Sequence, residues 1–406
     1  MRKVPELRFD GFDGEWEEKR YNNIFSKFQY GLNAPSKHFD GINKYLRITD
    51  IDDETRKFKS ENITSPDEDL DKLSSYTLED GDICFARTGA TVGKTYKYRS
   101  TDGKVYFAGY LIKGSIESEY DSDFIFQSTL TKKYENFIKI TSQRSGQPGV
   151  NSSELSNYKI SSPNKSEQEK IGDLFKKLDD LIEIQEAKVS KMEDFKKSML
   201  QKMFPKKGEF VPEFRFDGFD GEWYTKKADD ILVKNRKKNK DLAVDYVESV
   251  SNKFGFIKQT EQFEGYQLAS ADLSNYYVIE PYYFAYNPSR INVGSIAYKD
   301  KDGTTSVVSP LYVSFSTVSK INDYFIWYLF KTYQFEQQRQ SYAEGGVRDT
   351  LSFASLSEFK FVIPIIEEQE KIGHFFKNLD TKIENEEKLL DSYKMMKKSL
   401  LQKMFV

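Results

Sequence analysis

The chain has 406 residues, more than one ordinary hydrophobic core accommodates, so we expect two or more domains. Charged residues make up 31% and aromatic residues 15%, which is typical of a soluble globular protein and excludes a largely disordered one. The net charge of −3 excludes nucleic-acid binding through an overall positive charge, so any such contact needs basic residues gathered locally. The single cysteine, Cys84, excludes an intramolecular disulfide, and no apolar run suits a membrane span or signal peptide; we therefore expect a cytoplasmic protein.

The chain opens with a segment that it later repeats. Residues 4–16 read VPELRFDGFDGEW and residues 211–223 read VPEFRFDGFDGEW, with twelve of thirteen positions the same. We call each copy a head. The two copies are 207 residues apart, about half the chain. A repeat of this kind indicates two equivalent halves.

The block after the first head, residues 17–165, is predicted to mix α and β structure. Residues 81–112 predict a strand, a glycine-rich turn, a second strand, a hairpin turn at Asp102–Gly103 and a third strand. The turn, RTGATVGKT, resembles a phosphate-binding loop. However, Gly89 and Gly93 are separated by three residues where that motif needs four, and a strand follows where the motif opens a helix. A tight β-turn is the better interpretation, and its exposed basic residues could contact DNA phosphates.

A long helix is predicted over residues 166–207. Its apolar residues recur three and four positions apart, close to a heptad pattern. Ser166 is a plausible N-terminal cap and Pro205 a stop. About forty residues of helix span about 60 Å, which exceeds a small domain. A single stripe is also typical of a helix lying on its own domain, but two similar long stripes in one chain favour packing against each other.

The second half follows the same plan. A second mixed block leads to a second helix at residues 367–406, and EQEKIG at 167 recurs at 368, an offset of 201 residues. Val92–Gly93 and Val293–Gly294 share that offset. We therefore divide the chain into a first domain with its head (1–165), a first helical spacer (166–207), a second domain (208–366) and a second spacer (367–406). The predicted seam and partner-docking residues of the spacers are Ile171, Leu178, Leu181, Met192, Met199, Ile372, Leu379, Ile383, Met396 and Leu400.

The repeats close into a circle. The first helix ends QKMF and runs into the second head, and the second helix ends QKMFV at residue 406. Joining that end to the start would recreate nearly the same junction. The predicted fold class is α+β: two similar globular domains joined by two long antiparallel helices, pseudo-two-fold symmetric and circular in organisation.

Searches for catalytic patterns are negative. His38 and His374 have no metal-ligand spacing around them, so we predict no metal site. Tyr286–Arg290, YNPSR, has serine where an adenine-methyltransferase signature needs a second proline, and no glycine-rich loop suits S-adenosylmethionine. We therefore expect a non-catalytic chain.

The signals for nucleic-acid binding are local. Residues 234–240, KNRKKNK, form a basic run that could also be a solvated loop. Two glycine-bearing loops, 142–153 and 341–352, occupy equivalent places in the two blocks and carry side chains able to pair with base edges. In a two-fold arrangement they would read two half-sites. The candidate DNA-contacting residues are Arg87, Thr88, Lys94, Arg144, Gln147, Asn151, Arg236, Lys237, Lys238, Arg290, Asn292, Arg348 and Asp349.

These phrases together resemble the DNA-specificity subunit of a type I restriction–modification system. The resemblance covers the whole length and rests on the paired heads, the EQEKI helices, RTGATVGK, YNPSRINVGSIA, SGQPGVNSS and GGVRDTLSF. One departure is SPNKSEQEK before the first helix, where the family has a more apolar, proline-rich phrase. That departure weakens the packing expected at the first junction.

The resemblance implies two target-recognition domains on an antiparallel helical spacer, reading the two halves of a bipartite target in double-stranded DNA. It also implies that two methyltransferase subunits, and then restriction subunits, assemble on this chain. S-adenosylmethionine, ATP and Mg²⁺ would be bound by those partners, with no cofactor in this chain. The alternative is a coiled-coil tether or scaffold whose globular ends bind protein and not DNA.

Overall fold

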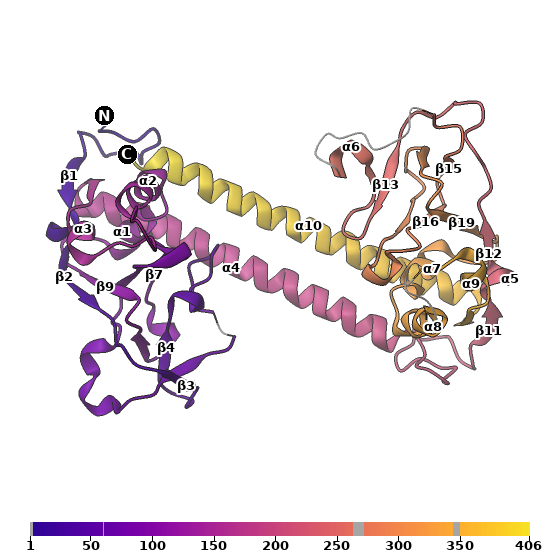
Figure 1. The fold of residues 1–406 in the computed structure, drawn as a ribbon, viewed down its shortest axis with the longest axis horizontal. Helices are drawn as coiled ribbons and strands as arrows, with labels where there is room; N and C mark the ends of the chain where they lie inside the picture. The colour runs from indigo at the N-terminus through magenta and orange to yellow at the C-terminus, as the bar shows by residue number, and fades with distance from the viewer. Residues whose placement is uncertain (1–2, 60, 263–271, 344–349) are drawn as a thin grey trace. The chain divides into compact units, whose positions relative to one another are not determined.

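The computed structural model describes residues 3–406 except 60, 263–271 and 344–349 (Figure 1). The chain forms two compact units: unit 1 holds residues 1–187 and 387–406, and unit 2 holds residues 188–386. The division passes through both long helices, because each end of each helix packs with a different globular part. The division expected from the sequence has four segments, because it places each long helix in a spacer separate from the two domains. None of the helices in the described residues is both long and apolar enough to cross a bilayer.

Unit 1 is built on a four-stranded antiparallel sheet with the strand order β2-β9-β6-β7. Strands β1 and β10 pair, as do β3 with β5, and β4 pairs in parallel with β8. The strands are β1 Glu17–Arg20, β2 Phe25–Tyr30, β3 Ser36–His38, β4 Lys44–Leu46, β5 Thr64–Pro66, β6 Ile83–Ala86, β7 Thr95–Lys97, β8 Val105–Phe107, β9 Leu111–Ile116 and β10 Lys159–Ser162. The helices are α1 Ser122–Ser128, α2 Lys132–Thr141, α3 Ser152–Ser156 and the start of α4 Lys165–Lys202.

Unit 2 repeats this plan with the sheet β12-β19-β16-β17 and the pairs β11–β20, β13–β14 and β15–β18. Its strands are β11 Tyr224–Lys227, β12 Leu232–Lys234, β13 Glu248–Ser251, β14 Gly255–Lys258, β15 Tyr277–Ile279, β16 Phe284–Tyr286, β17 Ile296–Tyr298, β18 Ser306–Val308, β19 Val313–Thr317 and β20 Lys360–Ile363. Its helices are α5 Ala228–Ile231, α6 Gln259–Gln262, α7 Asp323–Leu329, α8 Tyr333–Ala343, α9 Phe353–Ser357 and the start of α10 Ile366–Met404.

The prediction that the two blocks share one fold is confirmed. Helices α1 and α7, helices α3 and α9, and strands β10 and β20 each begin 201 residues apart, which is the offset read from the sequence. The units differ at the β13–β14 hairpin of unit 2, where unit 1 has the short 3-10 helix η2 (Ile48–Asp50) in the corresponding region. Each unit is therefore the same scaffold with locally different insertions.

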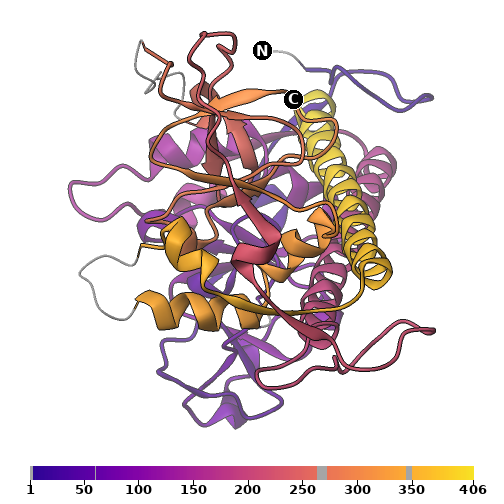
Figure 2. The same ribbon diagram turned by 90° about the vertical axis from the view of Figure 1, so that its right-hand side faces the viewer.

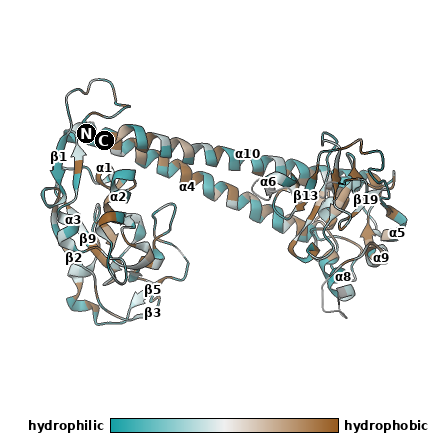
Figure 3. Ribbon diagram, turned by 45° about the horizontal axis from the view of Figure 1, so that its top comes forward, coloured by the Kyte–Doolittle hydropathy of each residue, from teal (hydrophilic) through white to brown (hydrophobic). Residues whose placement is uncertain are grey.

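The prediction of two long helices that pack antiparallel is confirmed. In unit 1, Asp179 of α4 pairs with Lys397 of α10 at 2.6 Å. In unit 2, Lys188 of α4 pairs with Glu386 of α10 at 2.7 Å. The later residue of α4 thus pairs with the earlier residue of α10, as antiparallel helices require. The two helices run side by side in both views of the ribbon (Figure 1, Figure 2). Apolar and polar residues alternate along them (Figure 3), as the heptad-like stripe predicts.

Two details of the sequence prediction are wrong. Helix α4 begins at Lys165, and its cap is Asn164, whose Oδ1 accepts from the Glu167 N–H at 3.0 Å; Ser166 lies inside the helix. Asp102–Gly103 does not join a hairpin, because β7 pairs with β6 while β8 pairs with β4. The Asp102 carboxylate instead accepts a 2.7 Å hydrogen bond from the Tyr96 hydroxyl.

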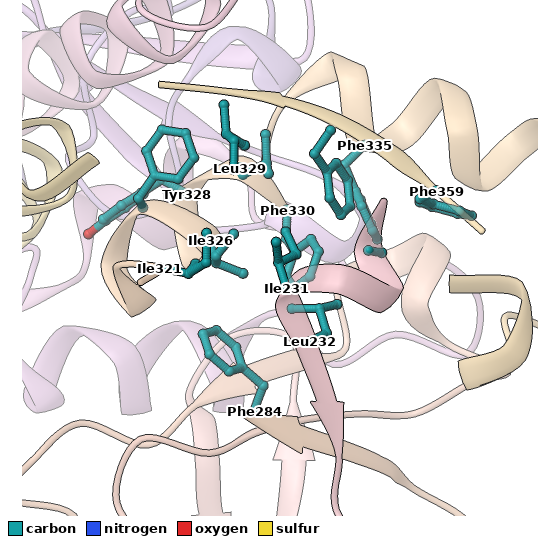
Figure 4. Packing of buried hydrophobic residues seen from close by; sticks show 14 of the residues in the cluster. Ile231, Leu232, Phe284, Ile321, Ile326, Tyr328, Leu329, Phe330, Phe335 and Phe359 are labelled. Carbon is teal, nitrogen blue, oxygen red and sulfur yellow. The ribbon is translucent and has the colours of Figure 1, made fainter. Parts of the chain in front are cut away.

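Aromatic side chains dominate both cores. In unit 2, Phe284 and Phe315 stack with ring centroids 5.0 Å apart. Ile326, Leu329 and Phe330 belong to the same cluster as Phe284 (Figure 4). Met203 and Phe204, which directly follow the last residue of α4, belong to the same cluster. In unit 1 the corresponding residues Met404 and Phe405 come from the end of α10. Each core is therefore completed by the helix that belongs, in sequence, to the other half.

Each head wraps the junction of the two helices within its unit. The backbone N–H groups of Glu6 and Leu7 donate to the Lys403 carbonyl at 2.8 and 2.9 Å. In unit 2 the Phe214 N–H donates to the Lys202 carbonyl at 2.8 Å. Because the last carbonyls of a helix have no partner within it, the head satisfies the C-terminus of one long helix. This contact gives the circular arrangement a structural basis.

Candidate nucleic-acid interface

Two loops of unit 1 are joined into one surface by backbone hydrogen bonds. One loop follows β6 and contains RTGATVGK; the other precedes α3 and contains SGQPGVN. The Val150 N–H donates to the Arg87 carbonyl at 2.9 Å, and the Gly89 N–H donates to the Pro148 carbonyl at 3.0 Å. We call these segments, 87–93 and 143–151, the unit 1 loop pair. It brings together Arg87, Thr88, Gln147 and Asn151, which the sequence predicts as DNA-contacting.

Arg87 is held in place by an aromatic side chain that the sequence analysis missed. Its guanidinium carbon lies 4.9 Å from the centroid of the Tyr30 ring, at the end of β2. The Tyr30 hydroxyl in turn accepts from the Ser152 N–H at 3.2 Å. Stacking on an aromatic face orders a guanidinium and leaves its edge free to donate. An aromatic residue at the end of a strand does not by itself indicate a DNA-binding role. Tyr30 could be linked to Arg87 only from the sheet order β2-β9-β6, which brings the end of β2 near the residue after β6.

The remaining predicted residues of the loop pair are differently engaged. Arg144 donates to the Thr141 carbonyl at 2.7 Å and to Glu154 at 2.5 Å, so its guanidinium is turned back onto the domain. Asn151 caps α3, with its Oδ1 accepting from the Glu154 N–H at 2.9 Å, and its side chain is exposed. Gln147 is exposed and packs its amide over Gly89.

Lys94 is not a surface residue, contrary to the expectation of an exposed phosphate contact. Its side chain is 7% exposed. The ammonium donates to the Ile51 carbonyl at 3.1 Å and pairs with Asp53. Burial of an ammonium is costly unless it is paired and hydrogen-bonded, and here it is both. Lys94 therefore ties the loop to the segment after β4, and we remove it from the candidate interface.

Unit 2 has a matching loop pair. The Leu351 N–H donates to the Pro288 carbonyl at 3.0 Å, and both residues lie 201 positions after Val150 and Arg87. Arg290 and Asn292 are exposed on the first loop. Arg290 is the N-cap of the 3-10 helix η7 (Ile291–Val293), Asn292 lies within it, and it ends at Gly294 with a φ of 79°. Glycine adopts this left-handed conformation without the steric cost of a side chain. Arg348 and Asp349, predicted for the second loop, lie outside the described residues.

The basic run 234–240 is more ordered than a solvated loop. Lys238 donates to the Asn275 carbonyl at 2.8 Å, and its ammonium lies 3.2 Å from the centroid of the Tyr277 ring. Lys237 pairs with Glu280 at 2.6 Å. Arg236, which directly precedes these two lysines, is exposed and makes no hydrogen bond or ion pair with any described residue. Of the three predicted residues, Arg236 has the charge most available to a phosphate.

Comparison with known proteins decides the identity of this scaffold. A family model described as the type I restriction modification DNA specificity domain matches the chain twice, over residues 14–194 and 220–393. The chain belongs to this family. Each match covers one mixed block and most of the long helix after it. The chain is thus a DNA-specificity subunit, and DNA recognition is its function.

Two solved structures resemble this specificity subunit along its length. The crystal structure of a type I restriction–modification S subunit from M. genitalium matches with a TM-score of 0.65 and 15% identity, covering 99% of each chain. A structure from work on complex assembly and conformational transition of the type I R-M system matches with a TM-score of 0.52 and 14% identity, covering 95% of each chain. At these identities the similarity establishes the fold.

The predicted spacer residues of the specificity subunit range from buried to exposed. Ile171, Leu178, Ile372, Leu379 and Ile383 are buried, and Met199 and Leu400 pack against the two cores from partly buried positions. Met192 is half-buried. Leu181 and Met396 are 46% and 53% exposed, so they remain able to contact a partner.

The sequence analysis also missed that each head makes a structural contact within its own unit. In unit 1, Arg8 donates from Nε and Nη2 to the two carboxylate oxygens of Glu167, each at 2.7 Å. In unit 2, Arg215 makes the same pair with Glu368 at 2.7 and 2.8 Å. Both arginines lie in the repeated heads and both glutamates in the repeated EQEK phrase. The presence of an arginine and a glutamate in both copies is the signal that could have linked them.

Proposed function

We propose that each unit of this specificity subunit reads one half of a bipartite duplex target through its loop pair. The observation that carries the proposal is the equivalence of two hydrogen bonds: Val150 to Arg87 in unit 1 and Leu351 to Pro288 in unit 2. The backbone frame is the same, while the side chains displayed on it differ. Side chains at the same place on two frames would read different bases in two half-sites.

The heads supply candidate docking surfaces for the methyltransferase subunits. Val4 and Leu7 of the first head are 38% and 44% exposed, and the equivalent Val211 and Phe214 of the second are 45% and 47% exposed. Exposed apolar residues at matching positions in two otherwise polar segments favour two copies of one partner. We infer that one methyltransferase subunit docks at each head and its adjacent helix surface, and that restriction subunits join through the methyltransferases.

The chemistry of the complex is assigned to those partners. The described residues contain no group of three or more His, Cys, Asp or Glu side chains that could hold a metal ion. We infer that this chain is non-catalytic and that S-adenosylmethionine, ATP and Mg²⁺ are bound by the methyltransferase and restriction subunits. Its own contribution is to position the DNA.

The experiment is selection from random duplexes, with and without the methyltransferase subunit, followed by sequencing of the bound fraction. We expect enrichment of two short defined sequences separated by a gap of constant length and no defined sequence. A chain that enriches no sequence under either condition, while still holding the methyltransferase, would instead be a coiled-coil tether. Loss of methyltransferase binding in the Leu7→Asp and Phe214→Asp variants, but not in Leu242→Asp, would support docking at the heads. Leu242 is a suitable control because it is 56% exposed and lies outside the heads.

A further inference from the structure

Unit 1 contains a polar cavity beside its loop pair that the reading of bases does not use. The cavity measures about 310 Å³ and lies between the segment after η2, the loop at Ala90–Thr95 and the start of α2. It is lined by charged and hydroxyl-bearing side chains, among them Arg56, Thr91, Lys94 and Tyr134. The lining comes from unit 1 alone. A cavity of this size admits a phosphate-sized group together with water.

The charge of Arg56 in this cavity is attracted by the Asp53 and Asp52 carboxylates only at longer range, without a hydrogen bond or close ion pair. Among the described residues, none forms a hydrogen bond or an ion pair with its guanidinium. Its backbone has a φ of 60°, a left-handed conformation that is uncommon for a residue with a side chain and that often marks a functional position. Burial lowers the pKa of Arg56 from its usual value. Arg56 therefore has both an unfavourable backbone conformation and a partly desolvated charge, and a bound anion would stabilise that charge.

Two hydroxyl groups on the cavity wall are also without partners. The Tyr134 side chain is buried, with 3% of the residue exposed, and its hydroxyl has no hydrogen-bond partner among the described residues. The Thr91 Oγ1 is likewise buried and unpaired within the described chain. Buried polar atoms almost always find a partner. Burial raises the pKa of Tyr134, so its hydroxyl keeps its proton and can donate.

The acidic residues at the cavity do not oppose an anion strongly, because each is already paired. Asp53 pairs with Lys94, and Glu135 pairs with Lys132 at 2.8 Å. Thr131, the N-cap of the ten-residue helix α2, also lines the cavity. The free N–H groups and dipole of a helix N-terminus favour negative charge. Arg56, two hydroxyl donors and a helix N-terminus thus converge from three segments.

We propose that this cavity binds a tetrahedral oxyanion of the phosphate class, with Arg56, Tyr134 and Thr91 as its donors. Three donors from separate elements match the several acceptor oxygens of a phosphate. The proposal applies to unit 1 only. The corresponding cavity of unit 2 has Asn292 in place of Thr91 and Phe335 in place of Tyr134, so the tyrosine hydroxyl is missing there.

The phosphate could come from two sources: the backbone of the bound DNA or a free ion. The cavity is lined by Ala90–Thr95, and the same loop carries Arg87 and Thr88 of the loop pair. A backbone phosphate could therefore occupy it while the loop pair contacts the adjacent bases, and this source rests on the proposed function. Binding of a free phosphate does not depend on that function.

The site itself is tested by calorimetric titration of the full chain with inorganic phosphate at constant ionic strength, with chloride as the reference salt. We expect saturable binding at one site, weakened about tenfold or more by Tyr134→Phe, since a hydrogen bond to a charged group is removed. Arg56→Gln should abolish binding. Arg20→Gln, at an exposed arginine of β1 outside the cavity and the loop pairs, should bind phosphate as the unsubstituted chain does. The mild Tyr134→Phe change copies the residue found in unit 2 and should leave the fold intact.

No saturable binding by the unsubstituted chain, or equal binding by the Arg56→Gln and Tyr134→Phe variants, would overturn the proposal. The source is then distinguished with target duplexes carrying single methylphosphonate linkages. If one neutral linkage weakens binding to the unsubstituted chain but not to Arg56→Gln, the DNA backbone supplies the phosphate. If Arg56→Gln loses inorganic phosphate but binds every duplex normally, the ligand is a free ion. Specific DNA binding without phosphate binding would refute the cavity proposal and leave the proposed function standing.

Discussion

The guanidinium of Arg8 forms a bidentate pair with the carboxylate of Glu167, with both hydrogen bonds 2.7 Å long. The Glu167 side chain is fully buried and that of Arg8 is 14% exposed. Arg8 also donates to the carbonyls of Asp13 and Gly14, so one side chain holds the head in its folded form and attaches it to the first turn of α4. The repeated heads are therefore internal clamps as well as candidate partner surfaces.

Removing the arginine of a clamp should destabilise its unit strongly. Arg8→Leu leaves a buried carboxylate without its partner, which typically costs about 3–5 kcal/mol of the free energy of unfolding. Urea unfolding monitored by tryptophan fluorescence would measure the loss. Lys3→Ala, which removes an exposed pair with Glu15, is the control and should cost less than about 1 kcal/mol. Equal effects of the two substitutions would show that the clamp is not a stabilising contact.

Asp121 should make the stability of unit 1 depend on pH. Its carboxylate caps α1 by accepting from the Phe124 N–H at 2.7 Å, and burial raises its pKa, assisted by Asp123 and Asp173. An acid with a raised folded-state pKa gives stability that is present below about pH 4, its unfolded value, and lost as the pH rises through the folded value. Asp121→Asn should thus raise the urea midpoint at pH 7 and have little effect below pH 4.

Unit 2 contains the matched control for that experiment. Asn322 occupies the equivalent position and caps α7 by accepting from the Phe325 N–H at 2.9 Å. Asn322→Asp should lower the midpoint at pH 7 and leave it nearly unchanged below pH 4. The same sign for both substitutions at pH 7 would contradict the assignment of the pH dependence to a buried charge.

Arg87 and Arg290 should each affect one half of the DNA target. Loss of a bidentate contact to a base costs about 1–3 kcal/mol at one base pair. Arg87→Ala should therefore relax specificity in one half-site and Arg290→Ala in the other, as read by methylation-site mapping of the assembled complex. Tyr30→Leu should relax specificity in the same half-site as Arg87→Ala does, because it removes the ring on which the Arg87 guanidinium stacks. Relaxation of both halves by one substitution would argue against one reader per unit.

The basic run of unit 2 should contribute to affinity more than to specificity. Each lost phosphate contact reduces the slope of log affinity against log salt by about one. Arg236→Gln should lower the slope by that amount, whereas Lys238→Gln should change it less because Lys238 is held by Asn275 and Tyr277. The Lys237 and Lys238 double substitution tests the sequence prediction directly. If its slope matches that of the unsubstituted chain, neither lysine contacts phosphate.

Helix length should set the gap between the half-sites. Adding one heptad to each long helix, after Glu186 and after Glu387, keeps the apolar stripe in register and lengthens each helix by about 10.5 Å. At about 3.4 Å per base pair the unread gap should grow by roughly three base pairs. Affinity should fall as well, because those base pairs also rotate the distant half-site. Methylation-site mapping measures the gap, and an unchanged gap in an active variant would exclude the helices as the ruler.

Repetition made much of the architecture predictable. The shared offset of 201 residues correctly predicted that the two blocks have one fold, and the heptad-like stripe correctly predicted that α4 and α10 pack together. These are properties of local sequence, since an apolar period selects a helix and its buried face. The prediction of a hairpin turn at Asp102–Gly103 was wrong, although this dipeptide is typical of hairpins. The Asp102 carboxylate instead accepts a hydrogen bond from the Tyr96 hydroxyl. Strand pairing over long distances overrode the local turn preference.

The sequence by itself determined that two equivalent halves exist, that each has a mixed block and a long helix, and which loops carry side chains suited to DNA. Only the tertiary structure decided which of those side chains are available. Lysine is usually a surface residue, but Lys94 is buried and its ammonium donates to the Ile51 carbonyl. Tyr30 lies against Arg87, and Arg56 and Tyr134 line one cavity, through contacts between segments distant in sequence. The physical reason is that the availability of a charge depends on its burial and its partners, and both are set by chain segments that no local pattern brings together.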